Sequence, residues 1–351
     1  MNITALENFV FLPFPGLSGK GKLHVLGSRG GYRPNGFVLI PYANPKKQKI
    51  AVQYYPILST HEVSLTEEVS STALKSIRPQ PSLSKEEYLN KVLELKKHIQ
   101  YGNIYEINFC MNFTANNAES DPIHTFFELQ KKANAPYAAL VKLGKDYILC
   151  ASPELFLKKE NTTLITKPIK GTARRGKTEQ EDQSLKQELQ NSLKEQTENV
   201  MAVDVARNDL SIIADRASVK VDTLFGIESF ATVHQMVSTV SCQLKPGTPF
   251  EEIINATFPM ASMTGAPKQM AMDLIDEFED FDRRYYSGSF GILDEKGDFK
   301  LNVVIRSIFY DSENKRINFA VGGAITYLSE PEKEYEECLL KAENLMRALT
   351  E

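Results

Sequence analysis

The chain has 351 residues, of which 42% are hydrophobic and 25% charged, and its formal net charge is −4. This composition predicts a soluble globular protein with a large core. The sequence has neither a long apolar run nor a cleavable signal, so we expect a cytoplasmic protein without membrane association. The acidic balance and the lack of a basic tract argue against a nucleic-acid partner. Glycine-rich motifs for ATP or NAD are also absent, so no nucleotide cofactor is expected.

The cysteine pattern agrees with a reducing compartment. In a chain of this size, cysteines that stand singly and form no CxxC pair indicate reduced thiols. The four cysteines that follow this pattern are Cys110, Cys150, Cys242 and Cys338.

Residues 1–78 are predicted to form a short, strand-rich N-terminal region. Residues 37–40 and 50–52 have the apolar composition of strands. A polar stretch rich in serine and proline, residues 76–84, separates this region from the remainder. We expect the N-terminal region to pack onto a catalytic domain formed by residues 79–351.

Ser84 and Glu87 form a capping box, which predicts the start of a helix with Tyr88 on its apolar face. Gly102 is a natural end for this helix. An alternating apolar pattern then predicts a strand at residues 104–109. Further strands are predicted at residues 137–141, 147–150, 154–157 and 164–165.

The middle third of the chain is predicted to be helical between residues 178 and 204. The last helix has Pro331 in its first turn and acidic residues directly after it, which suits the positive end of a helix dipole. Many neighbouring strands are linked as hairpins, so we predict an α+β fold with large, mainly antiparallel sheets. The remaining predictions are helices at residues 250–257 and 268–278 and strands at 239–244, 286–293, 301–309 and 316–321.

Two pairs of glutamates stand at helical spacing, Glu195 with Glu198 and Glu334 with Glu337. Residues three apart lie on the same face of a helix, and Lys341 extends the second face by one turn. Any one such pair alone is typical of a solvated surface. Together, carboxylates from two helices would suit Mg²⁺, which prefers hard oxygen ligands.

A series of motifs runs in order from about residue 84 to the end of the chain, and it resembles the chorismate-utilising enzymes. That family includes anthranilate, aminodeoxychorismate, isochorismate and salicylate synthases. The resemblance implies two large, mainly antiparallel sheets packed face to face with helices outside. The motifs are Ser152-Pro153-Glu154, Pro168-Ile169-Lys170-Gly171-Thr172, Glu195-xx-Glu198, 203–209, 234–238, 264–268, Tyr286-Ser287-Gly288, Ile305-Arg306-Ser307 and 334–337.

Lys170 indicates the branch of this family. Anthranilate synthases resemble PIAGT here, whereas lysine is characteristic of aminodeoxychorismate synthases. The resemblance implies Mg²⁺-dependent amination of chorismate at carbon 4 to 4-amino-4-deoxychorismate, for p-aminobenzoate and folate biosynthesis. Lys170 would add covalently at carbon 2 and then be displaced by ammonia, which splits one difficult substitution into two. Lys170 must be neutral to attack, and we expect burial near Mg²⁺ to depress its pKa.

The resemblance also implies roles for the other motif residues. Glu154 matches the general acid that protonates the departing hydroxyl. Glu198 and Glu337 match direct Mg²⁺ ligands. Glu195 and Glu334 match residues that bind the ion through water or that support the direct ligands. The residues that would bind the substrate are Thr172, His234, Tyr286, Arg306, Gly322, Ala324 and Lys341.

Three positions depart from the family pattern. Glu106 stands where hydroxylating members have a lysine and amine-adding members usually have glutamine, so it argues against water as the nucleophile. Its own role is left open by the sequence. Ala324 replaces a glycine and Cys338 a threonine, and both changes are small.

Chorismate and ammonia are the expected small-molecule partners. None of the cysteines lies in a nucleophile-elbow context, so we expect the ammonia to come from a separate glutamine amidotransferase subunit. Anthranilate synthase component I is the alternative activity, although Lys170 disfavours it. Isochorismate or salicylate synthesis would require lysine at position 106. A non-catalytic scaffold that only binds the amidotransferase is the alternative from another class of protein.

Overall fold

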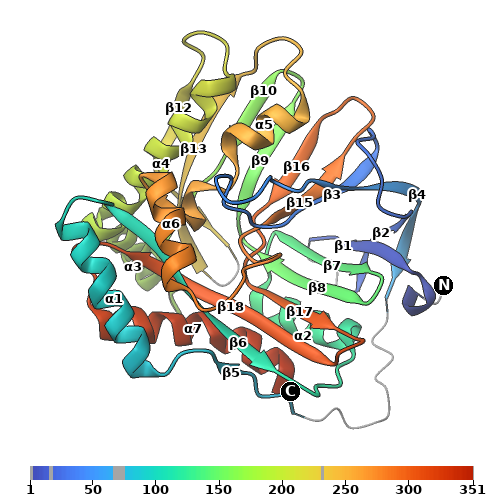
Figure 1. The fold of residues 1–351 in the computed structure, drawn as a ribbon, viewed down its shortest axis with the longest axis horizontal. Coiled ribbons are helices and arrows are strands. Elements are labelled where there is room, and N and C mark those ends of the chain that lie inside the picture. Colours follow the sequence, from blue (N-terminus) through green and yellow to red (C-terminus); the bar gives the residue numbers. More distant parts are fainter. Residues whose placement is uncertain (1–2, 16–18, 66–75, 231–232, 351) are drawn as a thin grey trace.

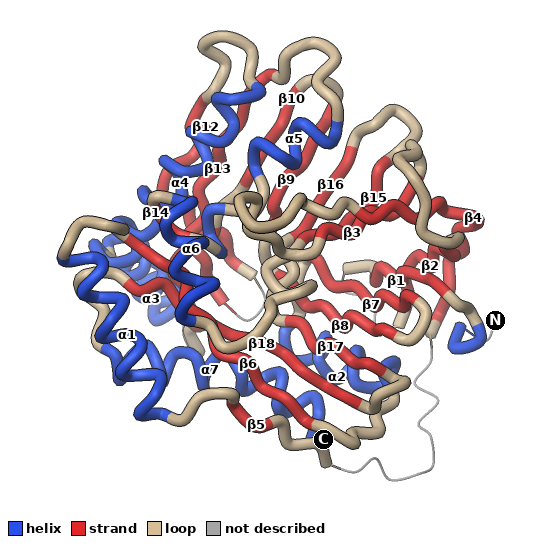
Figure 2. The backbone as a smooth tube through the Cα atoms, viewed as in Figure 1, coloured by secondary structure: helices blue, strands red, loops and turns tan. Residues whose placement is uncertain are grey.

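The computed structural model describes residues 3–15, 19–65, 76–230 and 233–350, and every strand pairing in it is antiparallel (Figure 1). The strands form two sheets. Strand β4 (Gln53–Ser64) takes part in both, because its first residues pair with β3 and its later residues pair with β2. Figure 2 shows the strands of both sheets with the helices around them. The predicted α+β architecture with two large antiparallel sheets is confirmed.

The first sheet has the strand order β5–β6–β18–β17–β8–β7–β1–β2–β4, and β14 (Gly265–Ala266) pairs with the first residues of β6. The bounds of the other strands are β1 Asn8–Pro13, β2 Lys20–Leu26, β5 Gln80–Pro81, β6 Glu106–Ala115, β7 Tyr137–Leu143, β8 Asp146–Ser152, β17 Ser307–Asp311 and β18 Arg316–Ile325.

The second sheet has the order β4–β3–β15–β16–β9–β10–β13–β12, and β11 pairs with β13 beyond the end of β10. Its strands, β4 apart, are β3 Gly36–Ile40, β9 Leu155–Glu160, β10 Thr163–Thr166, β11 Ile169–Arg174, β12 Lys220–Ser229, β13 Val233–Gln243, β15 Ser289–Leu293 and β16 Phe299–Asn302.

Side-chain alternation divides the core into two layers. Along β6, Phe109 and Met111 belong to a cluster shared with helices on the outside of the first sheet, whereas Cys110 belongs to a cluster shared with the second sheet. Successive residues of a strand point to opposite faces, so the first sheet is covered on both sides. The helices are α1 Lys85–Gln100, α2 Pro122–Ala133, α3 Glu179–Asn191, α4 Leu193–Ile213, α5 Phe250–Thr257, α6 Lys268–Phe278 and α7 Pro331–Thr350.

The helix predictions are confirmed for α1, α5, α6 and α7, and α1 begins with the predicted capping box of Ser84 and Glu87. The region predicted to be helical between residues 178 and 204 is confirmed as helical, and it contains two helices, α3 and α4. Ser192 ends α3, and its side chain accepts a hydrogen bond from the amide of Glu195 at the start of α4. Helix α4 also continues past residue 204 to Ile213. Helix α2 has no counterpart among the predicted elements.

The strand predicted at 301–309 is wrong, because it is two strands. β16 ends at Asn302 and β17 begins at Ser307, and Arg306 between them has a φ of 52°. The strand predicted at 286–293 starts only at Ser289, so Tyr286 lies in the turn before β15. Residues 50–52 precede β4 and are not a strand, and β11 and β12 were not anticipated.

The N-terminal strands are part of both sheets, since β1 pairs with β7 and β3 pairs with β15. Residues 66–75 of the predicted N-terminal region lie outside the described residues, and the boundary at residue 78 stays a prediction. In the described ranges, no helix has the length and apolar character needed to cross a membrane. The structure places all four cysteines as buried free thiols.

Candidate active site

Lys170 is directed into the protein by an irregular stretch of β11. The pairing of β11 with β13 shifts register between Ile169 and Thr172, and Gly171 within this bulge has a φ of +83°. A bulge of this kind changes the direction of the side chains that it carries. The side chain of Lys170 is only 7% exposed and forms an ion pair with Glu106 at the start of β6, whose side chain is 3% exposed.

One carboxylate, that of Glu106, contacts the ammonium of Lys170, and two more, those of Glu198 and Glu154, lie near enough to act on its charge. Burial alone would lower the pKa of Lys170, but Glu106, Glu198 and Glu154 together raise it above the usual value. The depressed pKa expected from the sequence referred to a site that holds Mg²⁺, and it stays a prediction. The sequence pattern did not reveal the ion pair with Glu106, which favours the charged amine.

Gly171 is required by the geometry of this bulge. A Cβ atom at residue 171 would lie 2.8 Å from Oε2 of Glu195, and the positive φ would be strained for any other residue. We expect Gly171→Ala to lower the free energy of unfolding by about 2–3 kcal/mol. Gly102→Ala is the matched control, because Gly102 has a φ of +77° but no atom within 4 Å of the added Cβ. It should cost only about 1 kcal/mol. Denaturant titration measures both, and equal losses would contradict the steric argument.

The two acidic helix starts face each other. The ammonium of Lys194, in the first turn of α4, lies 3.6 Å from Oε1 of Glu334 on α7 and 4.0 Å from Oε1 of Glu198. One turn further along α7, Lys341 forms an ion pair of 2.6 Å with Glu337. The structure therefore brings together the four glutamates that the sequence placed on two separate helices.

This carboxylate cluster fits a cation in its chemistry. In the described part of the chain, no three acidic, histidine or cysteine side chains converge as a preformed metal cluster, and lysines neutralise the carboxylates instead. Yet Oε1 of Glu198 is buried without a hydrogen-bond partner, and burial raises the pKa of Glu198 to about 7. A Cβ at Gly323 on β18 would lie only 3.3 Å from Oε2 of Glu334 and 3.8 Å from Oε1 of Glu337. Glycine there keeps open the space beside the acidic groups.

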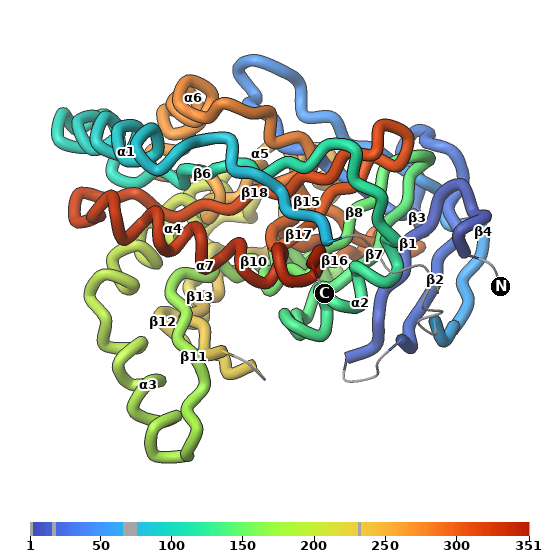
Figure 3. The backbone as a smooth tube through the Cα atoms, turned by 90° about the horizontal axis from the view of Figure 1, so that it is seen from below, coloured from blue at the N-terminus to red at the C-terminus, as the bar shows by residue number. Residues whose placement is uncertain are grey.

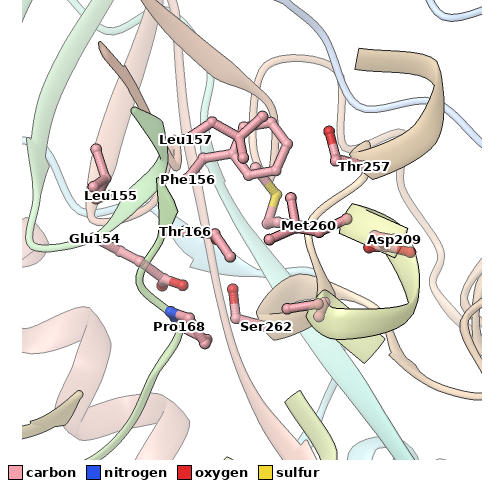
Figure 4. A pocket seen from close by; sticks show the side chains of 13 residues that line it. Glu154, Leu155, Phe156, Leu157, Thr166, Pro168, Asp209, Thr257, Met260 and Ser262 are labelled. Atoms are coloured by element: carbon pink, nitrogen blue, oxygen red, sulfur yellow. The ribbon is translucent and has the colours of Figure 1, made fainter. Parts of the chain in front are cut away.

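Glu154 lines a small, partly open cavity and lies near enough to Lys170 to be affected by its charge. Burial raises the pKa of its carboxyl to about 7, and the nearby charge of Lys170 opposes this only in part. Figure 4 shows its carboxylate and the hydroxyl of Ser262 on one side of the cavity, with Asp209 on the other. The cavity volume of about 20 Å³ has room for one water-sized molecule. Glu154 is thus a carboxyl that can carry a proton near neutral pH.

Arg306 supplies a guanidinium without a partner. Arg306 is half-buried. Its backbone carbonyl accepts a hydrogen bond from the amide of Ala151, but its side chain makes no hydrogen bond or ion pair with any residue that the structure describes. Burial lowers its pKa, and Tyr286 and Glu337 lie near enough to oppose that effect. The left-handed backbone at Arg306 is unusual for a residue with a side chain, and such conformations concentrate at functional sites. Its planar fork is suited to a carboxylate.

The other proposed substrate residues have different surroundings. Both ring nitrogens of His234 are engaged, Nε2 with Asp182 at 3.0 Å and Nδ1 with Ser229 at 2.8 Å, so His234 joins β13 to α3. Figure 3 shows α3 beside β11. Thr172 is exposed on β11. Gly322 accepts a hydrogen bond from Lys341 through its carbonyl, and Ala324 is buried two residues further along β18.

Sequence reasoning missed several contributors to this site. Gly323, rather than Gly322, borders the glutamates, because alternate residues of β18 point to opposite faces. Sγ of Cys110 lies 3.5 Å from the hydroxyl of Tyr286. Cys110 also contacts Arg283, which forms a buried ion pair with Glu279. Ser262 beside Glu154 comes from the short η2 turn (Ala261–Met263). None of these belongs to a motif, so only the fold identifies them.

This fold and this site define a class of protein, and the chain belongs to the chorismate binding enzyme family, whose sequence profile matches residues 41–347. The chain is 40% identical over 274 residues to the chloroplastic aminodeoxychorismate synthase of Arabidopsis thaliana, covering 77% of this chain and 30% of that protein. It is 36% identical over 270 residues to aminodeoxychorismate synthase component 1 of Escherichia coli K12, covering 77% of this chain and 59% of the relative.

The chain therefore spans between about a third and three fifths of the length of these relatives. A solved structure with the same fold is the menaquinone-specific isochorismate synthase of Escherichia coli. It superimposes with a TM-score of 0.79 and 17% identity, covering 97% of this chain and 88% of that one. At this identity the likeness concerns the fold alone.

Proposed function

We propose that this chain aminates chorismate at carbon 4 to give 4-amino-4-deoxychorismate, which feeds p-aminobenzoate and folate synthesis. The observation that carries the proposal is the position of Lys170. The bulge of β11 directs its amine into a buried site beside Glu154, a carboxyl with a pKa of about 7. The names of the relatives from Arabidopsis thaliana and Escherichia coli support the same reaction.

In the proposed reaction, the amine of Lys170 is the nucleophile and the carboxyl of Glu154 is the acid. The neutral amine of Lys170 adds at carbon 2 of the ring, the double bond shifts, and the bond from carbon 4 to its hydroxyl breaks. Glu154 gives its proton to that hydroxyl, which leaves as water. Ammonia then adds at carbon 4 and expels the amine of Lys170, and the new ammonium group returns a proton to Glu154. Covalent catalysis therefore replaces one difficult displacement by two easier ones.

Charged side chains at the rim would orient the substrate. Arg306, whose guanidinium pairs with none of the described residues, would bind the enolpyruvyl carboxylate beside Tyr286. Lys341 and the backbone around Gly322 and Ala324 would lie near the ring carboxylate, as would the hydroxyl of Thr172. We assign His234 a supporting position, because Asp182 and Ser229 already occupy its ring.

Magnesium is part of the proposal. Glu198 and Glu337 would hold the ion directly, and Glu195 and Glu334 through water, once Lys194 gives up its place between the helices. The bound ion would withdraw electrons from the ring through its carboxylate. Oε1 of Glu198, which accepts no hydrogen bond from the described residues, and the open space at Gly323 support this assignment.

Ammonia would come from a glutamine amidotransferase subunit. The Escherichia coli relative is named component 1, which implies a second component in that system. We propose that the present chain works with such a subunit in the cytoplasm and that ammonium salts replace it in vitro.

Product analysis tests the proposal. The purified chain, incubated with chorismate, Mg²⁺ and ammonium, should form 4-amino-4-deoxychorismate, which an added lyase converts to p-aminobenzoate. Chelation of the metal should remove at least about 99% of the activity, and added Mg²⁺ should restore it. Anthranilate as the product would move the assignment to anthranilate synthase. No turnover, even with an amidotransferase subunit supplied, would favour a scaffold.

A further inference from the structure

The side chain of Glu106 forms an ion pair with Lys170. The ion pair with Lys170 is the only side-chain hydrogen bond or salt bridge of Glu106 within the described ranges, and neither side chain is more than 7% exposed. The two residues are 64 positions apart in the chain and come from different sheets. Removing both charges of a buried pair from water is costly, so this pair is not explained by stability alone.

The proposed reaction needs a proton acceptor at this place. The amine of Lys170 is held in its charged form by Glu106, Glu154 and Glu198, and an ammonium has no lone pair with which to attack. Glu154 cannot accept the proton, because it must already carry one for the departing hydroxyl. Glu198 is assigned to the cation. Among the residues that the structure describes, Glu106 is the one whose carboxylate forms an ion pair with Nζ.

We propose that Glu106 is a catalytic residue that takes the proton of Lys170 before the amine adds to chorismate and returns it after the amine is expelled. This inference rests on the proposed function. The proton moves from Nζ to Glu106, the bond between Nζ and carbon 2 forms, and Glu154 protonates the leaving hydroxyl. When ammonia displaces the lysine, Nζ leaves as a neutral amine, and Glu106 gives the stored proton back. No external acid or base is consumed.

Transfer of the proton from Lys170 to Glu106 inside the site predicts how the amination rate depends on pH. With Glu106 present, the proton of Lys170 never has to reach the solvent, so this step is independent of pH. In Glu106→Gln the proton must leave to solvent, while Glu154 and Glu198 still face the amine. The fraction of neutral amine then rises about tenfold for each pH unit below the pKa of Lys170.

The experiment compares initial rates of 4-amino-4-deoxychorismate formation at constant free ammonia between about pH 6 and 9. The ratio of the Glu106→Gln rate to the unmodified rate should be lowest at acid pH and rise about tenfold per pH unit. Taking the ratio removes the titration of Glu154, which both proteins share. Glu106→Asp retains a carboxylate and should give a slower reaction whose ratio to the unmodified rate stays flat.

A flat ratio for Glu106→Gln, or a steep one for Glu106→Asp, overturns the inference while amination itself stands. Absence of product from the unmodified chain overturns the proposed function, and the inference with it. Cyanate, which modifies neutral amines, gives a readout without turnover. Peptide mass analysis should show that cyanate carbamylates Lys170 at least about fivefold faster in Glu106→Gln than in the unmodified chain. Carbamylation of Lys167 in the same samples is the internal reference. Equal rates would show that Glu106 does not control the proton of Lys170.

Discussion

Replacing Lys170 with alanine is expected to lower the formation of 4-amino-4-deoxychorismate by about 10³-fold or more. The variant has no amine to form the adduct at carbon 2, so ammonia would have to displace the hydroxyl directly. Any residual product should be diverted toward addition of ammonia at carbon 2. Chromatography with mass detection distinguishes the two products, and trapping of the covalent adduct on Lys170 gives an independent measurement.

Two controls separate chemistry from folding. Lys167→Ala removes a nearby lysine whose partner is Glu228 at the surface, and it should leave the rate within about twofold. Lys170→Ala also leaves Glu106 buried without its partner, which costs stability. The double variant Lys170→Ala/Glu106→Gln should recover much of that stability but no activity. Full activity in either variant without Lys170 would rule out the nucleophile.

Much of the fold follows from local sequence signals. The capping box of Ser84 and Glu87 locates the start of α1, and Pro331 marks the start of α7. The break before β17 could not be located in this way. Residues 303–305 are apolar and resemble a continuing strand, but Val303 donates its amide to Glu154 and Val304 donates to Gly288. These long-range hydrogen bonds, absent from any local pattern, override the strand propensity.

The sequence predicted those parts of the candidate site in which the spacing of residues along one helix fixes their relative positions. Glutamates three residues apart share a helix face, so Glu195 and Glu198 could be paired from the sequence alone. The contact of Lys170 with Glu106 depends on the bulge in β11 and on the packing of two sheets, and no local pattern encodes either. That contact, with Glu198 and Glu154 nearby, raises the pKa of Lys170, an effect that the sequence alone did not reveal.

Glu154→Gln is expected to lower the amination rate by about 10²- to 10⁴-fold, because an amide cannot protonate the departing hydroxyl. In the unmodified chain the acid must be protonated, so the rate should decline as pH rises above about 7. The variant should lack this decline. Glu160→Gln, at the exposed end of β9, is the control and should retain both the rate and the decline. A pH profile in Glu154→Gln that still falls near pH 7 would assign the acid to another residue.

The same substitution should change stability in the opposite direction from activity. The folded pKa of Glu154 is about 7 and the ordinary value is 4.5, so the native state binds the extra proton between these values. The free energy of unfolding contributed by Glu154 therefore falls as pH rises through this window, by about 3 kcal/mol in all. Glutamine has no charge to bury, so above pH 7 the variant should be more stable than the unmodified protein.

Denaturant titration at pH 5 and pH 8 measures this difference in the free energy of unfolding. A Glu154→Gln variant that is inactive yet more stable at high pH would show that Glu154 serves catalysis at a cost in stability. Loss of both activity and stability would indicate a structural role for Glu154.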